Sequence, residues 1–95
     1  MTFEIFQVND SHRELAFRSL KSTDVSRNAY DSVFHGGFDF DGSDAAALEE
    51  LFFIFNMNRP DDFHGHSMSV SDVVVLNDSD AWFCDSFGFK KIRFE

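Results

Sequence analysis

The 95-residue sequence contains only one cysteine, one proline, one tyrosine and one tryptophan, and it has no long apolar run. The single cysteine, Cys84, excludes an internal disulfide and fits a reducing compartment. No apolar segment approaches the roughly 20 residues that a helix needs to cross a bilayer. The N-terminal segment MTFEIFQVND lacks the basic start and apolar core of a signal peptide. We therefore expect a cytoplasmic protein with no membrane partner.

Cations are also scarce through most of the chain. Between Arg27 and Lys90 the sequence has twelve carboxylates and one cation, Arg59, and the formal net charge of the whole chain is −9. Such a surface repels nucleic acid and anionic lipid, so we expect no direct nucleic-acid binding. It attracts basic partners, including proteins that themselves bind nucleic acid, and it raises their association rate at low salt. The alternative is that the acidic surface serves solubility alone.

Phenylalanine is the abundant residue, with 14 copies in a chain that is 43% hydrophobic. A Phe ring buries a large apolar area and needs no hydrogen-bond partner, so we expect a core built largely from these rings. This composition indicates a folded chain and argues against disorder. A chain of this length supports one modest core, and we expect a single domain over residues 1–95.

One segment has a clear helical pattern. The prediction is a helix from Asp44 to about Asn56, with Ser43 or Asp44 as its N-cap. The spacing i, i+3, i+4, i+7 predicts an apolar stripe, formed by Leu48, Leu51, Phe52 and Phe55. Phe53 and Ile54 widen this apolar arc, so we expect the helix to be covered on more than one side. The alternative is that an exposed remainder forms a binding patch.

Alternating β-rich segments predict strands. We expect them at residues 3–8, 29–35, 69–76, 81–85 and 90–94. Turn-forming residues 77–80 predict a hairpin between the third and fourth strands. Residues 12–22 predict either a short helix or a turn, and residues 23–28 a polar connection. The resulting fold class is α+β: a small, mostly antiparallel sheet with one main α-helix packed on one face and the hairpin at its centre.

The residues that could carry chemistry form weak patterns. His64 and His66 flank a glycine, and with Cys84 or Asp85 they are weak candidates for a zinc site, since imidazole and thiolate suit that metal. The alternative is that one histidine bonds a backbone carbonyl and the other is solvated. A Cys84–His66 pair or a Ser/His/Asp set is the catalytic hypothesis. No nucleophile lies beside a glycine-rich loop, so we expect neither an enzyme nor a cofactor.

A longer pattern resembles a known family. The segments FNMNRPDDFHGHSMSVSDVVVL and WFCDSFGF are similar to the signature of the YodL-like domain family, most densely between Leu48 and Phe89. Residues 5–7 and 30–34 resemble it more weakly, and Trp82–Cys84 depart from its tyrosine-rich pattern. The resemblance implies a small bacterial domain of plasmids and other mobile elements. It also implies counter-defence roles, and one branch of the family resembles regulators of the actin-like bacterial cytoskeleton.

Charge and resemblance together lead to a functional hypothesis. The chain is expected to be a mobile-element inhibitor that occupies a basic nucleic-acid-binding surface of a host defence nuclease, of anti-CRISPR or anti-restriction type. A CRISPR effector nuclease is the expected partner. The contact candidates are Asp39, Asp41, Asp44, Glu49, Glu50, Asp61 and Asp62. The alternatives are a regulator of the actin-like cytoskeleton and a small metal-binding protein that uses the two histidines and the cysteine.

Overall fold

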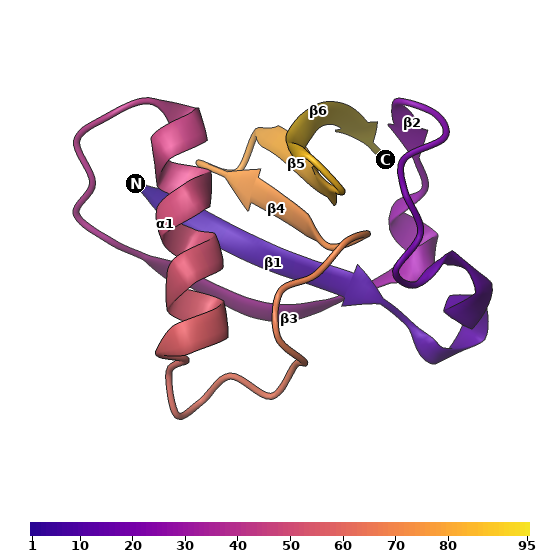
Figure 1. The fold of residues 1–95 in the computed structure, drawn as a ribbon, viewed down its shortest axis with the longest axis horizontal. Coiled ribbons are helices and arrows are strands. Elements are labelled where there is room, and N and C mark those ends of the chain that lie inside the picture. Colours follow the sequence, from indigo (N-terminus) through magenta and orange to yellow (C-terminus); the bar gives the residue numbers. More distant parts are fainter.

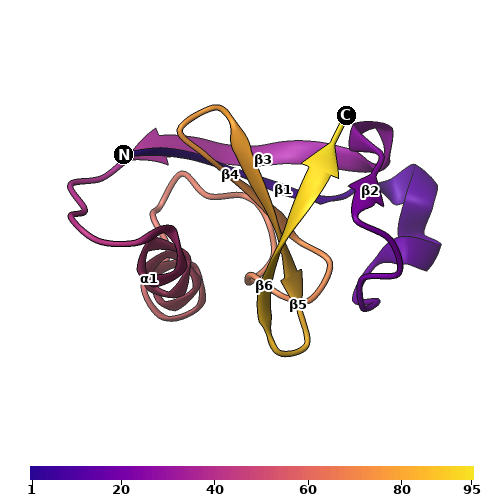
Figure 2. The ribbon, with the colours of Figure 1, turned by 90° about the horizontal axis from the view of Figure 1, so that it is seen from above.

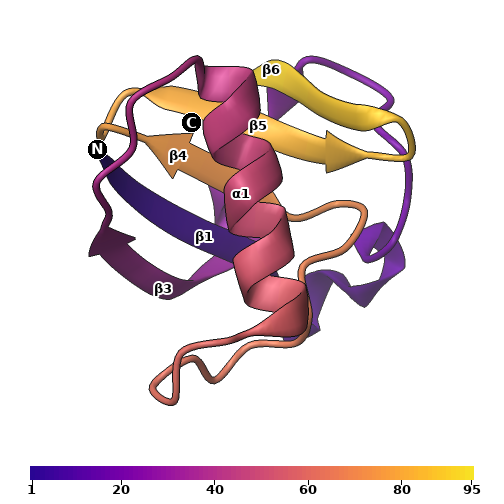
Figure 3. The same ribbon diagram turned by 60° about the vertical axis from the view of Figure 1, so that its left-hand side comes forward.

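Six strands form one sheet in the order β2-β6-β5-β4-β1-β3 (Figure 1). The computed structural model describes residues 1–95. The strands are β1 Thr2–Val8, β2 Asp24–Val25, β3 Tyr30–Gly37, β4 Val73–Leu76, β5 Asp80–Asp85 and β6 Gly88–Phe94. Neighbouring strands are antiparallel except β2 and β6, which are parallel. One helix, α1 (Asp44–Met57), crosses one face of the sheet (Figure 3), so the predicted α+β fold is confirmed.

Strand β4 is buried on both of its faces. Its four residues, Val73–Leu76, are at most 7% exposed. Because side chains alternate along a strand, Val74 and Leu76 join a core on the α1 side, whereas Val73 and Val75 join a second core on the opposite side. The first core consists of Phe3, Ile5, Leu48, Leu51, Phe55, Phe63, Met68, Val74 and Leu76. The second consists of Phe6, Ala29, Tyr30, Val73, Val75, Ala81, Phe83, Ile92 and Phe94.

Helix α1 begins and ends where the sequence indicates. The Ser43 hydroxyl accepts a hydrogen bond from the Ala46 backbone N–H at 3.2 Å, which caps the first turn. The helix stops at Met57, three residues before Pro60. Leu48, Leu51 and Phe55 are each 1% exposed and form the buried stripe. The structure contains no candidate membrane-spanning helix.

The prediction that α1 is covered on more than one side is wrong. Phe53 is 56% exposed and Met57 is 73% exposed, while Phe52 at the edge of the buried stripe is 37% exposed. Only the face toward β1 and β4 is packed, because the chain has no second long helix to place against the other side. The alternative, an exposed apolar remainder, is the arrangement that the structure has.

The second core is covered by an irregular segment. Residues 9–29 cross it with two 3-10 helices, η1 (Asp10–Leu15) and η2 (Arg27–Ala29), and with β2 (Figure 2). The prediction of a short helix within residues 12–22 is therefore wrong beyond Leu15, where η1 ends. Phe17 has a φ of 63°, which is incompatible with a continuing helix. The two-residue strand β2 was not predicted, because so short a segment has no readable alternation.

The strand expected at residues 69–76 begins four residues later than predicted. Ser71 has a φ of 87° and the Asp72 N–H bonds Ser69 O at 3.1 Å, so residues 69–72 form a turn. The strands at β1, β3, β5 and β6 are confirmed within a few residues. The predicted hairpin between β4 and β5 lies at the centre of the sheet, and Asn77 and Asp78 in its turn both have positive φ.

The packing of α1 predicts opposite outcomes for two neighbouring apolar residues. Leu51→Ala removes a side chain that is 1% exposed, and we expect it to lower the free energy of unfolding by about 2–5 kcal/mol. Phe53→Ala removes a larger side chain, but one that is 56% exposed. The free energy of unfolding should therefore change by less than about 0.5 kcal/mol. Urea unfolding followed by circular dichroism measures both. Equal losses for the two variants would contradict this orientation of α1.

Candidate functional site

The seven carboxylates predicted to contact a partner are all accessible. Six are exposed and Asp44 is half-buried. The five ion pairs of the chain involve other carboxylates, namely Asp10, Asp24, Asp72, Asp80 and Glu95. The predicted contact residues are therefore free to meet cations from outside the chain.

The structure brings five of the seven together and separates the other two. Asp39 and Asp41 lie in the loop that leads into α1, and Asp44, Glu49 and Glu50 lie in its first half. Asp61 and Asp62 follow the opposite end of the helix, in the loop drawn at the bottom of Figure 3. A 14-residue helix is about 21 Å long. We define the acidic end of α1 as Asp39, Asp41, Asp44, Glu49 and Glu50.

The basic residues lie elsewhere and are largely engaged. Seven of the eight are in the segment from Arg13 to Arg27 or on β6. Lys91 pairs with Asp80 at 3.4 Å, and Arg93 lies 3.9 Å from Asp24. The Arg27 guanidinium stacks over the Phe94 ring at 4.5 Å. No cation of the chain neutralises the acidic end of α1, so its negative potential is available to a partner.

The outer side of α1 changes from acidic to apolar along its length. Glu49 and Glu50 lie four and three residues before Phe53, and Met57 lies four residues after it, so all four are on the same side of the helix. All four are exposed. The Phe52 ring lies beside them, with its centroid 6.4 Å from that of Phe89. We call Glu49, Glu50, Phe53 and Met57 the outer face of α1. A large exposed apolar group beside charge is typical of a protein-binding surface.

A second group of polar side chains lies buried at the start of β4. Asp72 is fully buried, and its Oδ2 accepts hydrogen bonds from Gln7 Nε2 and from the Ser69 N–H, both at 3.0 Å. Gln7 also donates to His66 O at 2.8 Å and accepts from the His66 N–H at 3.1 Å. A Cβ on residue 65 would collide with Gln7 Oε1, which explains Gly65 there. The Gln7 amide thus fastens the loop after α1 to β1.

The other oxygen of Asp72 has no hydrogen bond. Oδ1 lies 4.0 Å from His66 Nε2, which is too long for one. Burial raises the pKa of Asp72 to about 6, although the hydrogen bonds from Ser69 and Gln7 and the nearby His66 act in the opposite direction. Gln7 lies 65 residues away in the sequence, so no local pattern indicated that it would complete the group.

The histidines and the cysteine are not assembled into a metal site. His64 and His66 are exposed, whereas Cys84 is buried within the sheet. Burial, followed by the charges of Asp72, Asp85 and Glu49, raises the pKa of the Cys84 thiol to about 12, so the thiolate that a metal or a nucleophile needs is disfavoured. No group of three or more His, Cys, Asp or Glu side chains is placed to hold a metal ion.

Ser69 and His66 do not form a nucleophile and base. Ser69 Oγ lies 3.4 Å from His66 Nδ1, but the same nitrogen lies 2.7 Å from Ser67 O. A nitrogen that close to a carbonyl must donate its proton to it, so it has no lone pair for a serine proton. Ser69 Oγ itself donates to Ser67 O at 3.0 Å. This arrangement fits the predicted alternative in which a histidine bonds a backbone carbonyl.

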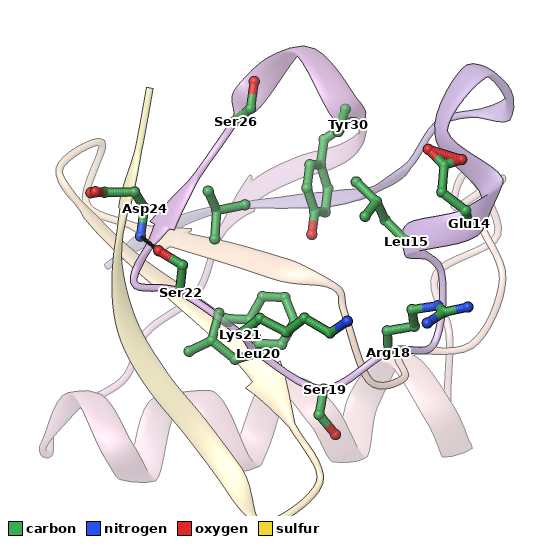
Figure 4. Close-up of a pocket in the computed structure, with 13 residues that line it drawn as sticks. Glu14, Leu15, Arg18, Ser19, Leu20, Lys21, Ser22, Asp24, Ser26 and Tyr30 are labelled. Carbon is green, nitrogen blue, oxygen red and sulfur yellow. Dashed lines mark hydrogen bonds between the residues drawn. The ribbon is translucent and has the colours of Figure 1, made fainter.

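A hollow of about 440 Å³ opens between residues 14–30 and the sheet (Figure 4). It had no signal in the sequence, because its walls come from irregular segments. Apolar side chains of Leu15, Leu20, Val25, Tyr30 and Phe83 contribute to its lining. No residue of α1 lines it, so the hollow and the outer face of α1 are separate surfaces.

Comparison with known proteins gives one match. A family model described as YodL-like domain matches residues 2–94, which is nearly the whole chain. The match extends the resemblance seen most densely between Leu48 and Phe89 almost to both ends of the chain. No curated protein and no solved structure matches the chain.

The buried Asp72 predicts a specific pH dependence of stability. Its pKa is raised from 3.8 to about 6, so the folded chain binds this proton more tightly than the unfolded chain does. Asp72 should therefore make stability fall as pH rises from about 4 to about 6, by up to about 3 kcal/mol. Asp72→Asn keeps an oxygen for Gln7 and Ser69 and removes the titration.

Urea unfolding of both proteins at several pH values between about 4 and 7 measures the effect. The difference between the two free energies of unfolding isolates Asp72 from the other carboxylates. We expect the Asn variant to gain stability relative to the parent chain as pH rises. A difference that stays constant across this range would contradict a raised pKa.

Proposed function

Since this chain belongs to the YodL-like domain family, we propose that it is a protein-binding inhibitor that blocks the basic nucleic-acid-binding surface of a host defence nuclease. It acts in the bacterial cytoplasm, is encoded by a mobile element, and works by occupancy and not by catalysis. The observation that carries the proposal is the acidic end of α1, where five accessible carboxylates have no cation of their own chain to pair with.

Unpaired carboxylates are suited to a surface that evolved to bind phosphates. A nuclease channel presents Lys and Arg side chains to a nucleic-acid backbone. Its affinity for nucleic acid depends on the pairing of these cations with the phosphates. Carboxylates held on a rigid helix and its entry loop compete for the same cations. An acidic protein also associates faster with a basic partner at low ionic strength. The inhibitor therefore needs no contact with nucleic acid.

The chemistry of the other polar groups supports binding over catalysis. The Cys84 thiol is held protonated by burial, and the His66 nitrogen nearest to a serine donates to a carbonyl. Most of the charged groups of the chain are carboxylates, 17 against 8 cations, and carboxylates are suited to electrostatic recognition. A stoichiometric complex is the expected mode of action.

A second candidate is a regulator of the actin-like bacterial cytoskeleton. The observation that favours it is the apolar half of the outer face of α1, where Phe53 and Met57 are 56% and 73% exposed. A pure phosphate mimic has no need of these side chains, whereas an apolar cleft on a filament subunit would bury them. The two candidates thus depend on different halves of one helix.

Removing charge from the acidic end of α1 should weaken inhibition. The test variant is Asp39→Asn, Asp41→Asn, Glu49→Gln and Glu50→Gln. Its matched control, Asp10→Asn, Glu14→Gln, Asp24→Asn and Asp31→Asn, changes the net charge equally at other exposed sites. If each lost contact costs about 0.5 kcal/mol, the test variant should bind a purified CRISPR effector about 30-fold more weakly.

Affinity by calorimetry and DNA cleavage by the effector are measured at about 50 and about 300 mM salt. The parent chain and the control should inhibit cleavage at low salt and lose affinity at high salt. Equal inhibition by the test variant and the control would contradict the electrostatic proposal. The second candidate is tested with a purified actin-like filament protein. It would be established if the chain binds this protein, if Phe53→Ser and Met57→Ser abolish the binding, and if the charge variant leaves it intact.

A further inference from the structure

The hollow of Figure 4 has the size and lining of a small-molecule site. Its volume of about 440 Å³ is within the range that ligand pockets occupy. Tyr30 and Phe83 belong to the second core and are 9% and 5% exposed. The Tyr30 hydroxyl already donates to Ser71 O at 2.7 Å, so the residue offers its ring and not a free hydroxyl. An apolar ligand body would extend the second core across these rings.

The hollow exists because the second core has an incomplete cover. Helix α1 covers the first core, whereas residues 9–29 cover the second with short irregular pieces. Leu15, at the end of η1, is left 42% exposed at the wall. The Leu20 side chain lies across from the Tyr30 ring in Figure 4. A ligand between them would bury apolar surface that the chain itself leaves open.

Two cations line the hollow, Arg18 and Lys21. Lys21 is the one placed for a ligand charge, because the Arg18 guanidinium points away from the Tyr30 ring in Figure 4. The Lys21 side chain extends across the mouth of the hollow in Figure 4, and it forms no ion pair. Glu14 and Asp24 also lie at the rim, and the chain carries a net charge of −9. These carboxylates oppose a ligand with several negative charges. A single negative charge at Lys21 is the charge that the rim favours.

The wall that carries Lys21 can adjust to a ligand. Between Ala16 and Ser22 the backbone is tied to the rest of the fold by two side-chain contacts. The Phe17 N–H bonds Ser71 Oγ at 3.0 Å, and the Leu20 N–H bonds Asp85 Oδ1 at 3.3 Å. Ser19 Oγ also lies 3.0 Å from Ser86 Oγ. A segment held by so few hydrogen bonds opens at a lower free-energy cost than the sheet does.

We propose that this hollow binds a small amphipathic monoanion, such as a medium-chain carboxylate. The apolar body lies against Tyr30, Phe83 and Leu15, and the carboxylate pairs with Lys21. The site is separate from the acidic end of α1, so its test does not depend on whether the inhibitor proposal is correct.

The test uses decanoate as the probe and 1-decanol as its neutral counterpart, each titrated into ¹⁵N-labelled full-length chain. Decanoate should give saturable amide shifts centred on Leu15, Lys21 and Val25. Lys21→Met keeps the apolar stem and removes the charge, and it should weaken decanoate about tenfold while leaving decanol unchanged. Lys90→Met, at an exposed position outside the hollow, should change neither.

A second variant tests the apolar wall. Leu15→Asn should weaken both probes, and Phe87→Asn, which alters a residue 93% exposed and outside the hollow, should weaken neither. Shifts centred on Phe53 and Met57 would show detergent-like binding to α1 and would overturn the proposal. Decanoate affinity that is unchanged in Lys21→Met, or no saturable shift in residues 14–30, would overturn it equally.

Discussion

The structure depends on a sheet whose central strand must be buried on both faces. Val73–Leu76 are apolar at every position and at most 7% exposed, so each face needs a cover. A 95-residue chain with one 14-residue helix cannot supply two equal covers. Helix α1 takes one face and an irregular segment takes the other. The outer face of α1 and the hollow beneath Leu15 both follow from this unequal division.

The entrance to that strand carries a polar group that constrains the fold. Asp72 is buried immediately before Val73, and its carboxylate is held by Gln7 from β1 and by the turn at Ser69. Gln7 in turn holds the loop after α1 through the backbone of His66. One amide side chain therefore joins β1, the loop and β4. The ionised form of Asp72 is destabilised by its burial, which is the cost of this arrangement at neutral pH.

The parts of the fold that were predictable are those with a local signal. Ser43, the Leu48–Phe55 spacing and Pro60 define α1, and the turn residues after Leu76 define the central hairpin. The exposure of Phe53 was not predictable, because an apolar residue on a helix does not reveal whether a second layer exists to cover it. The position of β2 depends on a parallel pairing with residues nearly seventy positions away.

The candidate site was predictable in composition but not in arrangement. Counting carboxylates identified the acidic residues, yet only the fold separates Asp61 and Asp62 from the acidic end of α1. The Gln7–Asp72 contact joins residues from opposite ends of the chain, and no local pattern encodes it. The hollow is likewise a product of tertiary packing.

We propose the acidic end of α1 as the surface that meets a basic partner, and the apolar half of the same helix lies beside it. The most direct test is amide hydrogen exchange of the chain, alone and mixed with a purified CRISPR effector nuclease. We expect protection on binding to concentrate in residues 38–57, with β6 and residues 13–29 unchanged. Protection of β6 and residues 13–29, with residues 38–57 unchanged, would contradict it.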